Sequence, residues 1–236
     1  MASILEPMRI GLLPSAGTAS RMNGIPKFLL PVSEQLQCLL DYHVMLMRPT
    51  VDRIIIPTRS EWVGLLHSFD FGPDVEVVEL NTATMAETLR SALAGIDYDS
   101  CVLGMPDTYF VGENPYEVLS QHPGHDMVLQ LYPTRPEQVG KVGSVRIDDN
   151  HTVVEHADKE PDRDFGWHWG VMEFAKHTEE FVDPSASTGG YLIDECLSRG
   201  LDVKGIPASE PYFDCGTFPE YLQCLTHLSL DNPVMP

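Results

Sequence analysis

Apolar residues in the first half of the chain form short runs that alternate with segments of helical spacing. The runs at 10–13 and 54–56 are typical of buried strands. Within 34–48, one face of an amphipathic helix is formed by Leu36, Leu39, Leu40 and Met47. The pattern predicts strands at 8–13, 53–57, 75–80 and 101–105, and helices at 34–48, 60–69 and 85–96, with Ser60 and Thr84 as candidate N-caps. Strands that alternate with helices indicate a parallel, doubly wound sheet.

The second half of the chain has more predicted strands and fewer helices. Strands are predicted at 126–132, 143–147, 152–156, 169–174 and 201–206, and helices at 187–199 and 218–228. Asp149-Asn150 is a candidate hairpin turn, and Gly200 a candidate helix C-cap. We therefore expect an α/β fold, with a single domain over 1–236 and a mostly parallel, Rossmann-like sheet. The second half, from about residue 111, is expected to be richer in strands.

The loop at 14–27 follows the first predicted strand. Ligands of doubly wound sheets bind beyond the carboxyl ends of the strands, which is where this loop lies. Its small residues allow a backbone to approach a ligand closely, and its exposed N–H groups, with the cations Arg21 and Lys27, are the donors that a phosphate-binding loop needs. An ordinary polar loop after a strand is the alternative interpretation.

Two aspartates are candidate ligands of a divalent cation. Asp107 comes directly after the predicted strand at 101–105 and Pro106, at the same edge of the sheet as the loop at 14–27. A carboxylate at this edge is placed to hold Mg²⁺ against phosphates, and a turn-stabilising aspartate is the alternative. Asp214 lies between aromatic residues and a Gly-Thr turn, where the cap of the following helix is the alternative role.

Other polar and aromatic residues of the second half allow two interpretations each. Lys159 follows the predicted hairpin, and a solvated surface lysine is the alternative to a ligand-binding role. Trp167-His168-Trp169 is bulky enough to stack on a sugar or a base, but core packing is the better interpretation. The sequence contains no nucleophile elbow, HExxH motif or Walker loop, so covalent catalysis has no support from it.

Composition excludes several classes of partner. With 15 basic and 35 acidic residues the formal net charge is −20, which argues against nucleic acid and against an anionic membrane surface, because both need a basic face. The five cysteines are scattered without a CxxC pair, which points to a reducing compartment and away from a zinc site. No secretory signal and no membrane-spanning apolar run is apparent, and we expect a cytoplasmic protein.

The order of these features resembles that of the sugar-phosphate nucleotidyltransferases, which make nucleotide sugars from a nucleoside triphosphate and a sugar 1-phosphate. Four segments, which together span most of the chain, carry the resemblance. They are Ala16-Gly17-Thr18-Ala19-Ser20-Arg21-Met22 with Pro26-Lys27-Phe28-Leu29-Leu30-Pro31-Val32, the strand and aspartate within 102–110, Asp158-Lys159-Glu160-Pro161, and Phe213-Asp214-Cys215-Gly216-Thr217 with the helix start after it. Their joint order is more specific than any one motif.

The resemblance implies a role for each matching residue. Nucleotide binding is implied for Ser15, Ala16, Gly17, Thr18, Ala19, Ser20 and Arg21, and for Glu79 and Thr84 in the region that reads the base. Catalytic roles are implied for Arg21, Lys27 and Asp107, Mg²⁺ binding for Asp107 and Asp214, and sugar-phosphate binding for Asp158, Lys159 and Gly170. The first half, to about residue 110, would then bind the nucleotide and the second half the sugar phosphate.

The implied reaction is in-line attack by a sugar-phosphate oxygen on the α-phosphorus of the triphosphate, with pyrophosphate as the leaving group. Homo-oligomers are common in this family, although no stretch of the sequence identifies an interface. Ala19 stands where the family usually has glycine, and residues 79–87 match the base-reading region poorly, so the base stays open. The alternatives are a cytidylyltransferase for a polyol or amino-alcohol phosphate, and a non-catalytic nucleotide-binding regulator with the same fold.

Overall fold

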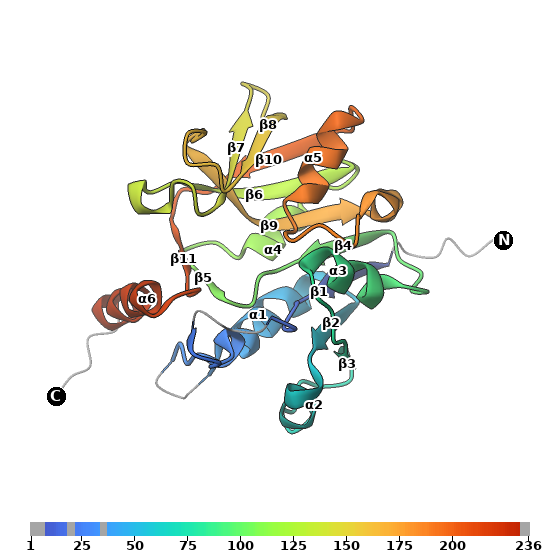
Figure 1. Cartoon of the computed structure of the whole chain (residues 1–236), viewed down its shortest axis with the longest axis vertical. Coiled ribbons are helices and arrows are strands. Elements are labelled where there is room, and N and C mark those ends of the chain that lie inside the picture. The colour runs from blue at the N-terminus through green and yellow to red at the C-terminus, as the bar shows by residue number, and fades with distance from the viewer. Residues whose placement is uncertain (1–7, 18–21, 34–36, 232–236) are drawn as a thin grey trace.

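A single mixed sheet runs through both halves of the chain in the computed structural model, which describes residues 8–17, 22–33 and 37–231 (Figure 1). Its main strands are β1 (Arg9–Leu12), β2 (Arg53–Thr58), β3 (Val75–Glu79), β4 (Ser100–Leu103), β6 (Met127–Pro133), β9 (Trp167–Ala175) and β10 (Val203–Pro207). Their order is β10-β6-β9-β4-β1-β2-β3, and only β9 runs antiparallel to its neighbours on this path. The predicted α/β fold with a mostly parallel sheet is thereby confirmed.

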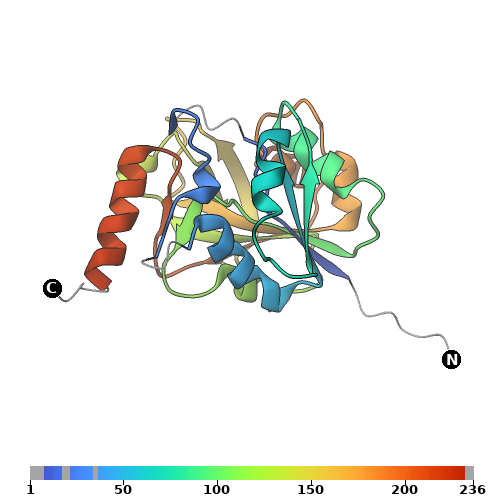
Figure 2. The ribbon, with the colours of Figure 1, turned by 90° about the horizontal axis from the view of Figure 1, so that it is seen from below.

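Helices cover both faces of the sheet (Figure 2). The α-helices are α1 (Leu39–Met47), α2 (Ser60–Leu66), α3 (Met85–Leu93), α4 (Pro115–Ser120), α5 (Tyr191–Ser198) and α6 (Phe218–Asp231), and the 3₁₀ helices are η2 (Lys27–Leu29), η3 (Arg48–Thr50), η4 (Pro136–Gln138) and η5 (Lys176–Phe181). Helices α3 and α5 pack on one face, and α1 and α4 on the other. None of the helices in the described part of the chain is long and apolar enough to cross a bilayer.

Side-chain alternation within the strands explains why both faces need cover. Ile55 of β2 belongs to the core under α3 and α5, whereas its neighbours Ile54 and Ile56 belong to the core under α1 and α4. All three isoleucines are fully buried. A parallel strand buried on both faces must be apolar at every position, which is why the sequence shows an uninterrupted run there.

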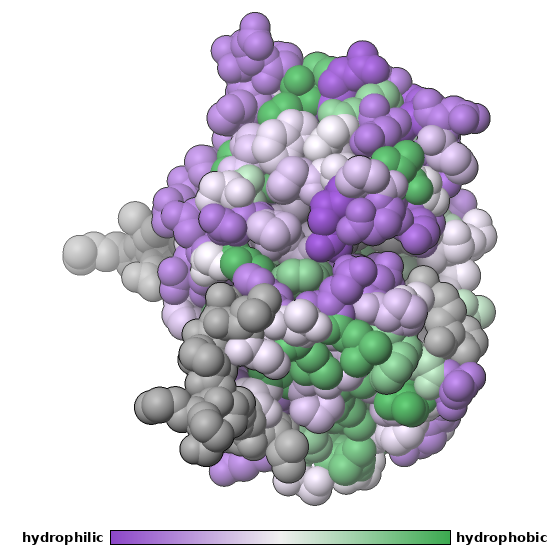
Figure 3. All heavy atoms as spheres, turned by 90° about the vertical axis from the view of Figure 1, so that its left-hand side faces the viewer, coloured by the Kyte–Doolittle hydropathy of each residue, from purple (hydrophilic) through white to green (hydrophobic). Residues whose placement is uncertain are grey.

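Two smaller β elements extend the fold. The hairpin of β7 (Gly143–Ile147) and β8 (Val153–Asp158) pairs with the start of β9. A separate antiparallel pair is formed by β5 (Thr108–Phe110) and β11 (Tyr212–Asp214). Helix α6 packs beside this pair at one side of the molecule. On that side, apolar residues gather in the lower half of the surface and polar residues in the upper half (Figure 3).

The structure corrects the predicted start of the first helix. The prediction placed it at 34–48, but α1 begins at Leu39, because Gln37 and Leu39 are hydrogen-bonded as extended chain to Val32 and Leu30. The expected start at residues 34–36 lies outside the described residues. Thr84 is confirmed as an N-cap, since its hydroxyl accepts a hydrogen bond from the Glu87 N–H at 3.0 Å.

Two short strands and one short α-helix were not predicted, and one cap was misplaced. The strands β5 and β11 have three residues each, which is too short for a period-2 pattern to appear. Helix α4 does have a start signal, because Asn114 caps it and Pro115 occupies its first position. Ser60 is the first residue of α2 rather than its N-cap, which is Arg59.

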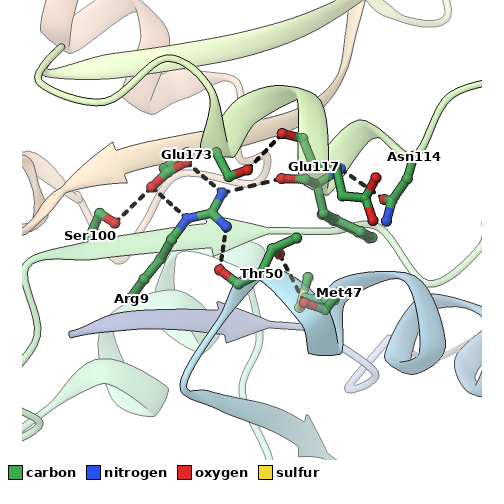
Figure 4. A network of polar contacts seen from close by, with 9 residues as sticks. Arg9, Met47, Thr50, Ser100, Asn114, Glu117 and Glu173 are labelled. Carbon is green, nitrogen blue, oxygen red and sulfur yellow. Dashed lines mark hydrogen bonds and ion pairs between the residues drawn. The ribbon is translucent and has the colours of Figure 1, made fainter. Parts of the chain in front are cut away.

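A largely buried ion pair ties the sheet together at the edge opposite the loop at 14–27 (Figure 4). Arg9 of β1 binds Glu173 of β9 through two hydrogen bonds of 2.9 and 2.7 Å, and its remaining donors bind the Thr50 and Tyr116 carbonyls. Ser100 of β4 also donates to Glu173, at 2.7 Å. Three neighbouring strands and the helices η3 and α4 therefore share one charged cluster.

Substitution of Glu173 by Gln is expected to destabilise the fold, because it leaves the Arg9 guanidinium, 15% exposed, without a carboxylate. Breaking such a pair costs about 3 kcal/mol of the free energy of unfolding, whereas an exposed pair contributes at most about 1 kcal/mol. The matched control is Glu76→Gln, which removes the partner of Arg53 in an exposed pair. Urea denaturation measures both variants, and equal small losses would contradict a stabilising role for the cluster.

His168 makes the stability of the fold depend on pH. Its ring is buried beside Tyr132 and Tyr212, and burial, followed by the charge of Arg135, lowers its pKa from 6.5 to about 3. The unfolded chain therefore takes up a proton between pH 6.5 and 3 that the folded protein does not. This contribution to stability is complete above pH 6.5 and is lost as the pH falls through that window.

His168→Phe is expected to keep the ring packing and to remove this titration. Urea denaturation at pH 7 and pH 4.5 should show a smaller loss of stability for the variant than for the unsubstituted protein. Carboxylate titrations contribute equally to both proteins and cancel in the comparison. The same loss of stability in both proteins would show that His168 is not responsible.

Candidate active site

A cavity of about 470 Å³ opens beyond the carboxyl ends of β1 and β4, at the edge of the sheet where the sequence predicted a ligand. Its lining comes from residues 14–17, 26–28, 82–85 and 88, 105–108, 141–143, 158–159, 169–170, 187–189, and from Tyr212 and Asp214. The two halves of the chain therefore both contribute to one cavity.

At the start of the loop that follows β1, Ser15 continues the pairing of β1 with β2. The Ser15 N–H donates to the Pro57 carbonyl at 2.8 Å and its hydroxyl to the Leu13 carbonyl, so these two donors are used within the protein. Ala16 and Gly17 line the cavity. Apart from its chain neighbours, no atom of the described residues lies within 4 Å of a Cβ added to Gly17, so their packing does not require glycine there. Thr18, Ala19, Ser20 and Arg21 lie outside the described residues.

Lys27 and Asp107 are in direct contact in the cavity. Lys27 begins the 3₁₀ helix η2, and its Nζ lies 2.8 Å from Oδ2 of Asp107, which follows β4. Their side chains are 16% and 22% exposed, respectively. The sequence predicted both residues as catalytic, and the structure brings them together from positions far apart in the chain.

The β5–β11 pair places Asp214 beside Asp107. Asp214 is opposite Thr108 in the ladder, and the Cys215 N–H donates to the Asp107 carbonyl at 2.8 Å. Burial raises the pKa of Asp214 to about 6, with further contributions from the charges of Asp107 and Glu220, while Lys27 opposes the shift. Two carboxylates thus repel each other in a partly dehydrated cavity.

This donor set fits a magnesium ion. Mg²⁺ prefers carboxylate oxygens and is commonly held by one or two of them together with substrate phosphates and water. Asp107 and Asp214 provide two such carboxylates, and a cation between them would relieve their repulsion. Within the described residues, no cluster of three or more His, Cys, Asp or Glu side chains could hold a metal by itself, so substrate oxygens would have to complete the coordination.

Two side chains of α1 hold the strand that follows Asp107. The Tyr42 hydroxyl donates to the Phe110 carbonyl at 3.1 Å and accepts from its N–H at 3.3 Å. His43 Nε2 lies 2.9 Å from the Thr108 carbonyl. Burial lowers the pKa of His43 to about 4, so the ring is neutral at pH 7 and donates this hydrogen bond from Nε2. The position of β5, and with it Asp107, therefore depends on α1.

The candidate sugar-phosphate residues line the other side of the cavity. Asp158 ends β8, and Lys159 follows it with a φ of +58° and donates its N–H to the Val142 carbonyl at 3.2 Å. Gly170 lies on β9, where a Cβ would come within 2.7 Å of the Tyr132 ring. Close packing therefore requires glycine at 170, in contrast to Gly17.

The two predicted base-reading residues differ in position. Thr84 lines the cavity, but its hydroxyl donates to the Pro184 carbonyl at 2.6 Å and caps α3. Glu79 ends β3 and is exposed, with its carboxylate accepting from Asn81, and it is not among the lining residues.

Several lining residues were not predicted from the sequence. They include Thr82, Ala83, Met85, Thr88, Lys141, Gly143, Ser187, Thr188, Gly189 and Tyr212. Trp169, for which core packing was the better interpretation, also lines the cavity. Lys141 had a usable signal, because the two ends of a hairpin lie side by side and the other end carries Lys159. The residues at 187–189 precede a helix and had no comparable signal.

No family model and no curated protein matches the sequence. Solved structures do match. A UDP-glucose pyrophosphorylase complexed with UDP-glucose superposes with a TM-score of 0.80 at 13% identity, covering 95% of this chain and 100% of that one. The UDP-glucose pyrophosphorylase from Acinetobacter baumannii gives 0.79 at 16% identity, covering 96% and 95%, respectively.

The inositol-1-phosphate CTP transferase from T. maritima gives a TM-score of 0.74 at 15% identity, covering 95% of this chain and 97% of that one. The likeness extends over the whole length of each of these proteins. Their names describe enzymes of nucleotidyl transfer to sugar and inositol phosphates. The chain therefore has the fold of the sugar-phosphate nucleotidyltransferases, the family that its sequence motifs resemble.

Proposed function

We propose that the protein transfers a nucleotidyl group from a nucleoside triphosphate to a sugar 1-phosphate and releases pyrophosphate. The observation that carries the proposal is the contact of Lys27 with Asp107, beside Asp214, in a cavity beyond the sheet edge. A cation and two carboxylates beyond the carboxyl end of a parallel strand are suited to phosphate chemistry. The motif order and the shared fold support the same reaction class.

The strand order supports separate binding positions for the two proposed substrates. Residues 14–17 follow β1, and 82–85 follow β3, on one side of β4. The hairpin that ends in Asp158 is attached to β9, on the other side of β4. Asp107 follows β4 itself and lies between them. The nucleotide would bind over β1–β3 and the acceptor over β9, with the reacting phosphates meeting near Asp107.

In the proposed reaction, an oxygen of the acceptor phosphate attacks the α-phosphorus of the triphosphate. A new P–O bond forms, the bond between the α- and β-phosphates breaks, and the electron pair leaves with pyrophosphate. Lys27, held in place by Asp107, would neutralise charge on the α-phosphate, and Ala16 and Gly17 would let the backbone approach the triphosphate. No protein nucleophile is needed.

Mg²⁺ dependence is part of this proposal. A magnesium ion held by Asp107 and Asp214 would add charge neutralisation at the phosphates. The protein's own part is to keep the two carboxylates close in a partly dehydrated cavity, through the β5–β11 pairing and the support of α1.

A cytidylyltransferase acting on a polyol phosphate is the second candidate. The likeness to the inositol-1-phosphate CTP transferase, which extends over 97% of that chain, favours it. Both candidates would use Lys27 and Asp107 at the reacting phosphates, and they differ in the base and the acceptor. A panel of nucleoside triphosphates crossed with sugar 1-phosphates and polyol phosphates, with pyrophosphate release as the readout, distinguishes them.

Asp107→Asn is expected to lower pyrophosphate release by about 10³-fold or more, because it removes a charge from the reacting centre. Asp214→Asn should have a similar effect. Circular dichroism should show that both variants remain folded. The matched control is Asp149→Asn, an exposed aspartate in the β7–β8 turn, which should retain full activity. Near-full activity in Asp107→Asn would refute the proposed role of the cavity.

Gly17→Ala tests the approach of the backbone to the nucleotide. Apart from the chain neighbours, no described residue contacts the added methyl group, so the free energy of unfolding should change by less than about 0.5 kcal/mol. The KM for the nucleotide should rise about tenfold, because the methyl group occupies cavity space. In the comparison variant Gly143→Ala, the Cβ would lie 2.4 Å from Nε1 of Trp169, so stability itself should fall. An unchanged nucleotide KM in Gly17→Ala would contradict close approach at this residue.

A further inference from the structure

Two lysines that line the cavity, Lys141 and Lys159, have no side-chain partner in the described part of the protein. Every other lysine and arginine there forms an ion pair with a carboxylate or donates a hydrogen bond to an oxygen. The contrast is informative because the chain has 35 acidic residues and only 15 basic ones. In such a chain, cations without a partner are unexpected.

Both lysines lie at the same end of one hairpin, formed by β7 and β8. Gly143 of β7 is opposite Asp158 of β8, so Lys141 precedes this pair by two residues and Lys159 follows it by one. The Lys159 N–H donates to the Val142 carbonyl at 3.2 Å, and the Lys141 N–H to the Gln138 carbonyl at 2.9 Å. The backbone therefore fixes the starting points of both side chains at the cavity wall.

Neither of the acidic residues beside Lys159 in the sequence neutralises the two lysines. Glu160 forms its ion pair with Arg163. Asp158 Oδ1 lies 3.5 Å from the position that a Cβ of Gly190 would occupy, and Asp158 forms no ion pair with either lysine. Lys159 also has the left-handed φ of +58°, which costs a non-glycine residue free energy. Both lysines are exposed at the cavity wall. A bound anion between them would lower their mutual repulsion.

We infer that Lys141 is an acceptor-binding residue, which together with Lys159 clamps a single phosphate monoester in its dianionic form. The inference rests on the proposed function for the identity of the acceptor. It adds Lys141 to the acceptor site, and it identifies the acceptor as a phosphate with two negative charges rather than a phosphodiester or an unphosphorylated sugar. Compact ammonium groups suit this ligand, because each contributes a full charge and several donors.

The clamp also distinguishes the acceptor from the product. When an acceptor oxygen forms the new P–O–P link, the acceptor phosphate becomes a diester-like group with one negative charge instead of two. Two lysines therefore hold the incoming phosphate more tightly than the same phosphate after transfer. This difference favours release of the product from the hairpin side of the cavity.

Lys141→Ala is expected to raise the KM for the acceptor about tenfold or more, since a charge-assisted hydrogen bond is lost. The KM for the nucleotide should stay within about twofold. Lys159→Ala should have the same effect, and Lys141→Arg should restore most of the affinity. The matched control is Lys204→Ala, a lysine of β10 that binds Thr152 and does not line the cavity, and it should leave both KM values unchanged.

A pH profile separates a charge clamp from a merely structural lysine. The second pKa of a phosphate monoester is about 6, so the acceptor KM of the unsubstituted protein should rise below that pH as the dianion is lost. In Lys141→Ala this rise should be smaller, because one of the two charges that select the dianion is gone. An unchanged pH profile would contradict the clamp.

Binding of inorganic phosphate, followed by ³¹P NMR, tests the clamp without turnover. Phosphate binding that is lost in Lys141→Ala and Lys159→Ala, but not in Lys204→Ala, supports the clamp even if no substrate pair reacts, and in that case only the proposed function fails. If Lys159→Ala alone weakens phosphate and acceptor binding, the role of Lys141 is overturned while the function stands. No phosphate binding by the unsubstituted protein, or an equal loss of nucleotide and acceptor affinity in Lys141→Ala, would overturn the clamp.

Discussion

The candidate site depends on the pairing of β5 with β11. Two strands of three residues each bring together Asp107 and Asp214, which come from opposite halves of the chain. Without this pairing, Lys27 would still reach Asp107, but the second carboxylate would have no fixed position. Three residues per strand form few ladder bonds, so Tyr42 and His43 of α1 secure β5 from outside the pair. The site is therefore built by side-chain hydrogen bonds as much as by the main sheet.

The large elements of the fold could be predicted because strands that are buried on both faces are uninterrupted apolar runs in the sequence. An isoleucine run such as 54–56 has few other interpretations, and the amphipathic pattern of α3 and the Thr84 cap were equally direct. The pattern failed where long-range pairing decides local structure. Gln37 and Leu39 form backbone hydrogen bonds with the extended chain at 30–32. No local sequence signal shows that α1 begins only after these hydrogen bonds.

The site could be predicted only where a motif carried it. Lys27, Asp107 and Asp214 belong to segments whose order resembles one family, and the structure brings them into one cavity. Lys141 belongs to no motif. The predicted hairpin indicates that it lies near Lys159, but only the structure shows that both line one cavity and that neither has a carboxylate partner among the described residues. The roles of Arg21 and its neighbours stay predictions, because these residues lie outside the described part of the chain.

The long sequence separation between the two carboxylates has a consequence for folding. Asp214 follows β10, so a chain synthesised only as far as β10 contains Asp107 without its second carboxylate. Contacts between distant segments also form late in folding, because a long loop must close first. The site is thus completed only after the sheet that supports it, and partly folded chains carry the first half of the cavity without the paired carboxylates.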